Sequence, residues 1–184
     1  DARRNPDSLV NNLAADLGCQ HISTGLTGFD FGVCNYPMFS LRDDAALRGE
    51  MIAVMRDRGI SISLGEGLVI RPGVSGSDFA RDMDLFVELG CNRVNTVSMD
   101  PDFARTRDEF GVLAEMGAAR GLRVTTELAP SLTISSLPLA LEALKQVGRD
   151  DFRLLIDTMH VVRSGSTPAD IAALDPALID YIQL

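Results

Sequence analysis

The chain repeats one pattern of apolar and polar positions: an amphipathic stretch, a glycine, a short apolar run and a loop. The junction glycines are Gly18, Gly59, Gly90 and Gly121, and the last three are spaced 31 residues apart. A glycine just past a helix end readily adopts the left-handed conformation that turns the chain into a strand. The repeat therefore predicts helices that alternate with strands.

The apolar runs predict strands at about 19–23, 60–65, 93–98, 122–127, 152–157 and 179–184. The amphipathic stretches predict helices at about 8–17, 41–57, 78–89, 102–120, 138–147 and 168–174, the first with Leu9, Leu13 and Leu17 on one face. Single helices between strands imply right-handed crossovers and a parallel sheet. Units of about 30 residues favour an α/β fold of the (β/α)8 TIM-barrel type, and an open doubly wound sheet is the alternative.

The whole chain, residues 1–184, is expected to form a single TIM-barrel domain with about six parallel strands, an incomplete barrel. The chain opens on a helix that should follow a strand, and it stops where a strand ends. This arrangement predicts that the first strand and the last β/α unit of a full barrel are absent.

Composition narrows the range of partners. The net charge of −9 disfavours a nucleic-acid partner. The sequence contains no run of eighteen apolar residues, so it predicts no membrane-spanning helix. The polar segment Asp1–Asp7 lacks the apolar core of a signal peptide. Cys19, Cys34 and Cys91 are odd in number and far apart, which fits a reducing compartment. We expect a cytoplasmic protein that acts on a small polar metabolite, as a monomer or a homo-oligomer.

The carboxyl ends of the strands are where chemistry gathers in such folds. Glu127 and Asp157 each close an apolar strand, where an unpaired carboxylate would carry a large desolvation penalty. A shared divalent cation removes that penalty. Carboxylate oxygens suit Mg²⁺ or Mn²⁺, and an added imidazole would also suit Co²⁺ or Zn²⁺.

Other polar residues near the expected strand ends have two interpretations each. His21 and Glu66 are candidates for substrate binding. Alternatively, His21 is a histidine that only makes hydrogen bonds, and Glu66 is a solvated charge in a loop. Arg163, ahead of Ser164-Gly165-Ser166, could bind a carboxylate or phosphate, or be an exposed loop cation. Asp100 is expected to cap the helix that follows it.

From residue 58 to residue 184 the chain resembles the xylose-isomerase-like TIM barrels, the group that includes sugar phosphate isomerases and epimerases. The segments that carry the resemblance are Gly121-Leu122-Arg123-Val124-Thr125-Thr126-Glu127-Leu128-Ala129-Pro130, Asp157-Thr158-Met159-His160 with Arg163-Ser164-Gly165, Pro168-Ala169-Asp170 and Tyr181-Ile182-Gln183-Leu184.

The resemblance implies a metal held by Glu127, Asp157 and Gln183, with His160 in contact with substrate. Many relatives have a histidine in place of Gln183, and a glutamine there looks like the 3-dehydroshikimate dehydratase branch. The fourth ligand of the family is a glutamate on a last strand that this chain does not contain. His21 and Glu66 match no motif of the family and stay candidates on their position alone.

The implied function is that of a divalent-metal-dependent isomerase or epimerase of a small sugar, sugar phosphate or polyol-derived ketone. Such an enzyme abstracts a proton next to a carbonyl and passes through an enediolate, with Glu127 and His160 as the catalytic residues. The alternatives are a metal-dependent dehydratase and a non-catalytic sugar-binding barrel. DNA repair of the endonuclease IV type is disfavoured, because the chain is acidic and has only two histidines.

Overall fold

The computed structural model describes residues 6–28 and 38–184, and side chains from residue 11 onwards within those ranges. Residues 1–5 of the polar amino-terminal segment, Cys34 and the side chain of Leu9 lie outside this description. Cys19 and Cys91 are free thiols.

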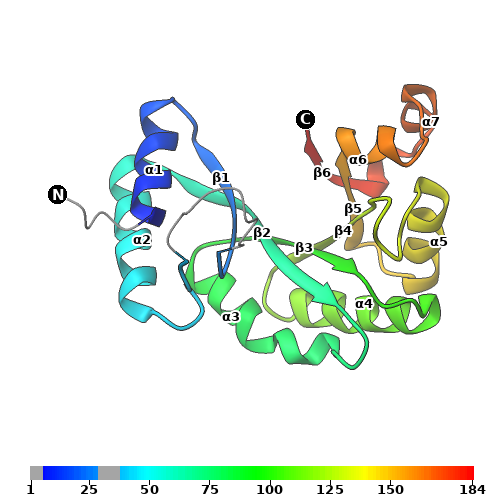
Figure 1. Cartoon of the computed structure of the whole chain (residues 1–184), viewed down its shortest axis with the longest axis horizontal. Helices are drawn as coiled ribbons and strands as arrows, with labels where there is room; N and C mark the ends of the chain where they lie inside the picture. The colour runs from blue at the N-terminus through cyan, green and yellow to red at the C-terminus, as the bar shows by residue number, and fades with distance from the viewer. Residues whose placement is uncertain (1–5, 29–37) are drawn as a thin grey trace.

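Six parallel strands form one curved sheet whose spatial order is the order of the sequence. The strands are β1 (His21–Gly25), β2 (Ser61–Ile70), β3 (Arg93–Ser98), β4 (Arg123–Glu127), β5 (Phe152–Asp157) and β6 (Ile179–Gln183). The sheet bends into a trough, with the helices along its convex side (Figure 1). The predicted incomplete (β/α)8 barrel is thereby confirmed, and a flat sheet with helices on both faces is not observed.

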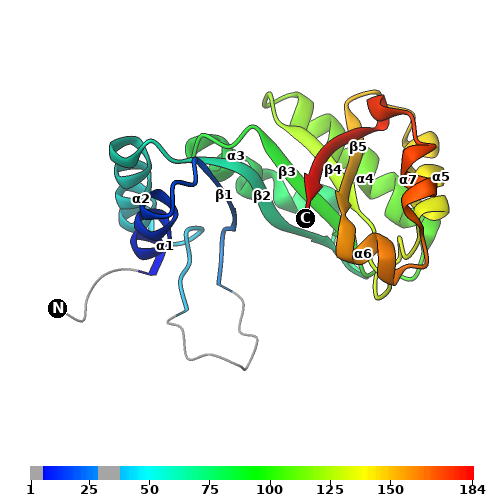
Figure 2. The same cartoon turned by 90° about the horizontal axis from the view of Figure 1, so that it is seen from above.

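Each crossover between strands contains at least one helix, as Figure 2 shows from above. The helices are α1 (Pro6–Asp16), α2 (Ala45–Arg58), α3 (Ala80–Glu88), α4 (Phe103–Ala118), α5 (Leu137–Val147), α6 (Thr158–Arg163) and α7 (Pro168–Ala172), with 3-10 turns at Gly76–Phe79 and Pro176–Leu178. The helix α6 was not predicted. Within the described ranges, no helix is long and apolar enough to cross a bilayer.

Helices α2 and α4 begin directly after residues that are well suited to cap them. The side chain of Asp44 accepts a hydrogen bond from the backbone N–H of Leu47 at the start of α2, and Gly59 ends that helix with a φ of 67°. The cap of α4 was wrongly predicted to be Asp100. Asp102 fills that role and accepts from the N–H of Arg105 at 3.0 Å, while the buried Asp100 accepts from the N–H of Asp102.

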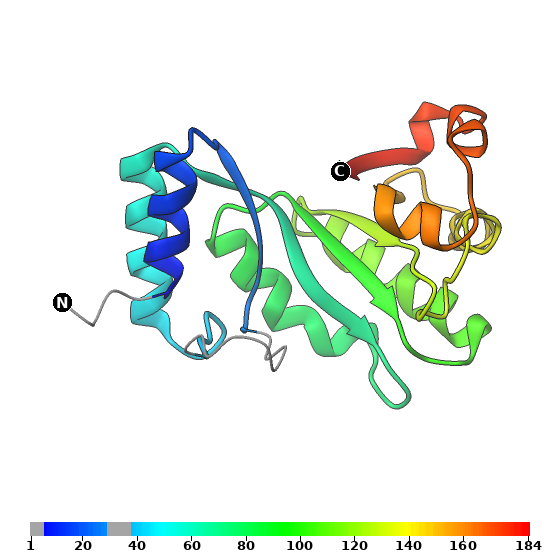
Figure 3. The same ribbon diagram turned by 45° about the horizontal axis from the view of Figure 1, so that its top comes forward.

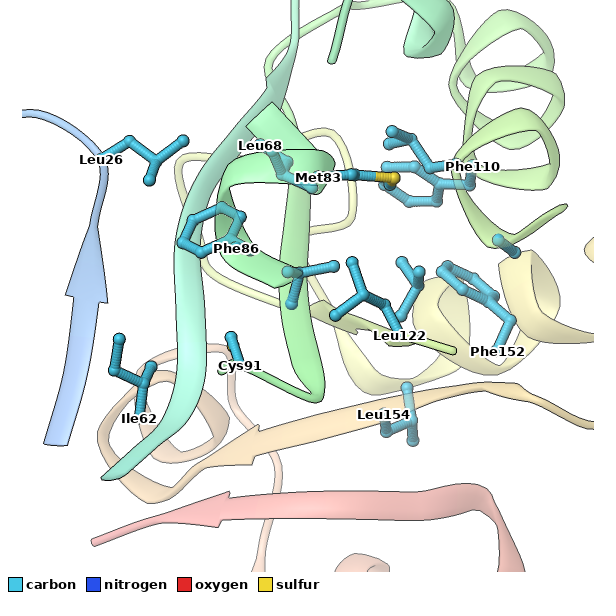
Figure 4. Packing of buried hydrophobic residues seen from close by; sticks show 14 of the residues in the cluster. Leu26, Ile62, Leu68, Met83, Phe86, Cys91, Phe110, Leu122, Phe152 and Leu154 are labelled. Carbon is cyan, nitrogen blue, oxygen red and sulfur yellow. The ribbon is translucent and has the colours of Figure 1, made fainter. Parts of the chain in front are cut away.

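The main core lies between the convex face of the sheet and helices α3, α4 and α5. Phe86 of α3 and Phe110 of α4 are fully buried, and the ring of Phe110 lies 5.6 Å from that of Phe152 on β5 (Figure 4). Ile62 on β2 and Leu154 on β5 point into the same core from the sheet. Burial of these side chains holds the strands at the curvature that brings their carboxyl ends together.

The leucine-bearing side of the first helix is exposed where it is described. Leu13 and Leu17 are 56% and 71% exposed, whereas Asn11 and Ala14 are buried. The reason is that α1 packs against α2 and β1, and the side that carries Asn11 and Ala14 is the one turned toward the protein.

The concave side of the trough is crossed by polar contacts that start from β6. Asp180 pairs with Arg93 of β3 at 2.5 Å and with Arg123 of β4 at 2.8 Å. The hydroxyl group of Tyr181 lies 2.8 Å from that of Ser63 on β2. The register of β6 against β5 slips at Asp180, as in a β-bulge, so that Asp180 and Tyr181 both take part. Figure 3 shows β6 rising opposite the amino-terminal half of the sheet.

Candidate functional site

Three polar residues end three neighbouring strands. Glu127 is the last residue of β4, Asp157 of β5 and Gln183 of β6. In the parallel register Glu127 lies beside Leu155, and Asp157 lies beside Gln183. Because the strands are parallel and adjacent, the three side chains gather at one end of the trough, where the sequence predicted them.

His160 joins this group through the helix that starts directly after β5. One carboxylate oxygen of Asp157 accepts a hydrogen bond from the backbone N–H of His160 at 3.0 Å and so caps α6. The first turn of that helix brings His160 Nε2 to 3.7 Å from Glu127 Oε1. One ligand atom each from Glu127, Asp157 and His160 lies within 4.8 Å of the other two.

Glu66 reaches the same site from the opposite wall of the trough. The strand β2 does not end at Glu66 as predicted but continues to Ile70. Gly67 has a φ of 102°, and the register with β3 slips between Gly65 and Leu68, which is a β-bulge that re-aims the neighbouring side chain. Glu66 Oε1 accepts a hydrogen bond from Gln183 Nε2 at 3.3 Å.

Asn95 is a site residue that sequence reasoning missed. It lies inside β3, is 3% exposed, and donates from Nδ2 to Glu127 Oε2 at 3.1 Å. Its own amide oxygen accepts from the hydroxyl group of Thr125. The available signal was an amide inside a central strand of the predicted sheet, because a buried amide needs partners that only a polar interior supplies.

The carboxylate cluster, defined as Glu66, Glu127 and Asp157, is electrostatically unfavourable on its own. Burial raises the pKa of Glu127 to about 7, and the negative charges of Glu66 and Asp157 add to that effect, against a hydrogen bond from Asn95. Burial also raises the pKa of Glu66, again with a contribution from Asp157. Such a cluster favours either a shared proton or a bound cation.

The donor set fits a divalent metal. Two carboxylates and an imidazole each offer a ligand atom within 4.8 Å of the other two, and the amide of Gln183 lies at the neighbouring strand end. The Gln183 nitrogen and oxygen exchange places by a simple amide flip, which would turn the oxygen toward a cation. His160 Nδ1 is buried without a hydrogen-bond partner, so the ring has a nitrogen not committed to the fold.

A cavity of about 370 Å³ lies over the inner wall beside the cluster. Its polar lining comes from Ser23 and Thr24 of β1, Glu66 of β2, Asn95 of β3 and Glu127 of β4. It is large enough for a small sugar or polyol to lie with hydroxyl groups against these side chains.

Two predicted site residues lie apart from this group. The prediction that His21 lies at the carboxyl end of its strand is wrong: His21 opens β1, is exposed, and is hydrogen-bonded to Ser61 at the amino-terminal end of the sheet. Arg163 lies in the last turn of α6 rather than in a loop. It is exposed, and no described residue pairs with it.

Comparison with known proteins gives one curated relative and many similar folds. The chain is 29% identical, over 94% of its length, to a 2-epi-5-epi-valiolone 7-phosphate 2-epimerase of Actinoplanes sp., and it spans 65% of the length of that relative. No protein-family profile matches the chain.

Among solved structures, D-psicose 3-epimerase of Clostridium cellulolyticum H10 with bound D-tagatose has a TM-score of 0.75 at 12% identity. That match covers 97% of this chain and 67% of the epimerase. The IOLI protein with a bound zinc atom has a TM-score of 0.72 at 17% identity and covers 93% of this chain and 65% of that protein. At these identities the likeness shows that the chain shares their barrel fold.

Proposed function

We propose that this chain, which has the fold of the xylose-isomerase-like TIM barrels, provides the metal-dependent site of a sugar isomerase or epimerase. The substrate class is a small sugar, a sugar phosphate or a polyol-derived ketone. The observation that carries the proposal is the convergence of Glu127, Asp157 and His160 at the carboxyl end of the sheet. The name of the 29% identical relative, an epimerase of a phosphorylated cyclic ketone, supports the same class of reaction.

Glu127, Asp157, Gln183 and His160 are the residues that would hold or flank the metal. When bound, a divalent metal supplies positive charge that polarises the carbonyl oxygen of the substrate. Asp157 has one oxygen engaged in capping α6, which leaves the other free for the cation. This double use fixes the orientation of the carboxylate.

Proton transfer falls to Glu127. As a carboxylate at the end of β4, it is placed to take up a proton from the carbon next to a carbonyl and to give the proton back. The 3.1 Å hydrogen bond from Asn95 holds one of its oxygens, so the other faces the site. Returning the proton to the neighbouring carbon isomerises the substrate, and returning it on the opposite face epimerises it.

His160 and Glu66 would lie on opposite sides of the substrate, one on each wall of the trough. His160 lies beside Glu127 on the β4 and β5 side, and Glu66 lies on the β2 side with Gln183 as its partner. Both side chains can exchange hydrogen bonds with substrate hydroxyl groups. Arg163, three residues after His160 along α6, is proposed to approach an anionic substrate group from the same side of that helix.

Proton exchange in D₂O tests this function directly. The protein is stripped of metal, reloaded with Mg²⁺, Mn²⁺, Co²⁺ or Zn²⁺, and incubated with ketoses, sugar phosphates, inosose-like polyols and dehydroshikimate. We expect metal-dependent deuterium incorporation next to the carbonyl of one substrate, lost in Glu127→Gln and kept in the control Glu115→Gln on the exposed side of α4.

Water loss from dehydroshikimate would instead assign the dehydratase reaction. Metal and sugar binding without any exchange would identify a sugar-binding barrel. Absence of metal binding would overturn the proposal.

A further inference from the structure

A second cavity, of about 310 Å³, lies on the other side of the carboxyl ends of β1 and β2, next to α3. It shares Gly25, Glu66 and residues 67–69 with the cavity beside the carboxylate cluster, so the two cavities meet at the bulge of β2. Unlike that cavity, it is lined by two arginines, Arg42 and Arg71.

Arg42 is held in place by a buried partner. Its Nε and Nη2 atoms donate to the two oxygens of Asp82 at 2.8 and 2.6 Å, and the Asp82 side chain is 9% exposed. A bidentate pair of this kind fixes the plane of the guanidinium group. The Nη1 donors of Arg42 are not used by Asp82, and the side chain is 39% exposed at the cavity.

Arg71 is exposed and forms no ion pair with any described side chain. It follows β2 directly, and its backbone oxygen accepts hydrogen bonds from Arg105 at 3.0 Å and from the N–H of Val74 at 3.0 Å, which fix the turn. Among the described side chains, residues 11–28 and 38–184, no carboxylate forms an ion pair with its guanidinium group. Arg105, by contrast, is paired with Asp100 and Glu109.

Two arginines face the carboxylates of Asp82 and Glu66 in this cavity, whereas the cavity beside the cluster is lined by Glu66 and Glu127 and by no arginine or lysine. Of the three carboxylates of the cluster, Glu66 lies at the junction of the two cavities, and Glu127 and Asp157 lie at the ends of β4 and β5. A molecule with an anionic end would be repelled by the carboxylates and attracted by the arginines, while its uncharged end could still reach the cluster past Glu66.

We propose that Arg42 and Arg71 form a phosphate subsite that binds the phosphate group of a phosphorylated sugar or polyol whose reacting carbons lie at the carboxylate cluster. This inference rests on the proposed function for the identity of the rest of the substrate. Arg42, oriented by Asp82, presents a fixed pair of donors, and Arg71 adds a second positive charge. Planar guanidinium groups match the oxygens of a phosphate dianion.

The test measures binding of inorganic phosphate to the metal-free protein in the presence of a chelator, by calorimetry or NMR titration. Without metal, failure of the metal-dependent reaction cannot affect the result. We expect saturable binding that weakens about tenfold or more in Arg71→Gln, because a charge-assisted contact is lost. Arg56→Gln is the matched control, since Arg56 is exposed on α2 and lines neither cavity.

Acetate at the same concentration should bind more weakly than phosphate, because its charge is lower and it has fewer oxygens. No saturable phosphate binding, equal loss in Arg71→Gln and Arg56→Gln, equal binding of acetate, or a loss confined to Arg163→Gln would each overturn the proposal.

Discussion

Replacing Glu127 with glutamine is expected to stabilise the metal-free protein at alkaline pH, because it removes a carboxylate that the fold holds among like charges. Burial together with Glu66 and Asp157 raises the pKa of this carboxyl from 4.5 to about 7. In the unfolded chain the ordinary value returns. Between these two pH values the folded protein therefore keeps a proton that the unfolded chain has released.

The sign of the effect follows from that difference. Below about pH 4.5 the carboxyl is protonated in both states, and the stability associated with its raised pKa is fully present. As the pH rises through 7 that stability is lost, and above pH 7 the loss is complete. The rise in the pKa of Glu127 from 4.5 to about 7 corresponds to a loss of roughly 3 kcal/mol in the free energy of unfolding if the site is closed to solvent. Partial solvent access reduces this to about 2 kcal/mol.

The assay is urea unfolding of the wild type and Glu127→Gln at pH 5 and pH 8, with a chelator present. The free-energy difference between the two proteins should grow by about 2 kcal/mol in favour of the variant from the lower to the higher pH. The wild type and the variant share all other titrating groups, so the contributions of most of those groups cancel in the difference between their free energies of unfolding. Glu66→Gln should show a change of the same sign, because burial raises the pKa of that carboxyl as well.

Saturating divalent metal should reverse the order at pH 8, because the cation compensates the same charges in the wild type. A Glu127→Gln variant that is no more stable than the wild type at pH 8, or whose advantage is the same at both pH values, would refute the electrostatic reasoning.

Three further predictions concern the site and the scaffold. Asp157→Asn should weaken metal binding at least tenfold in calorimetry while α6 stays capped, since asparagine is also a good N-cap; unchanged affinity would remove Asp157 from the metal site. Gly117→Ala should lower the free energy of unfolding by about 1–3 kcal/mol, because a Cβ there would lie 2.4 Å from the Val124 side chain, whereas Gly111→Ala on the same helix meets no atom within 4 Å and should be neutral or stabilising. Asp180→Ala should cost about 2–4 kcal/mol in urea unfolding, because it leaves the buried Arg93 unpaired; a loss under 1 kcal/mol would show that the pair contributes little.

The elements that sequence analysis placed well are those in which a local pattern decides the outcome. The strands Arg93–Ser98 and Phe152–Asp157 match the predicted ranges to the residue, because each is a short run rich in β-branched or apolar residues that follows a glycine with positive φ. Glu127 and Asp157 were found as strand ends for the same reason. Parallel pairing then brought them together without any further information.

What the sequence did not reveal depends on register and on distant partners. The bulge at Gly67 extends β2 and turns Glu66 toward Gln183, a contact between the second and last strands. His21 was misplaced because β1 begins at His21, two residues later than predicted, so that His21 lies at the amino-terminal end of the strand. Asn95 was overlooked because its role is defined only by Glu127 on the neighbouring strand.

The order of the sheet also has a consequence for how the protein folds. Every strand pairs with the one before it in the sequence, so the sheet can grow outward by short-range steps. The contacts across the trough are different: Tyr181 meets Ser63 over 118 residues of chain, and Gln183 meets Glu66 over 117. Closing such long loops is entropically expensive before neighbouring contacts exist. We therefore expect the two walls of the site to join late in folding. Binding of metal and substrate at the site then requires that all strands from β2 to β6 are already in place.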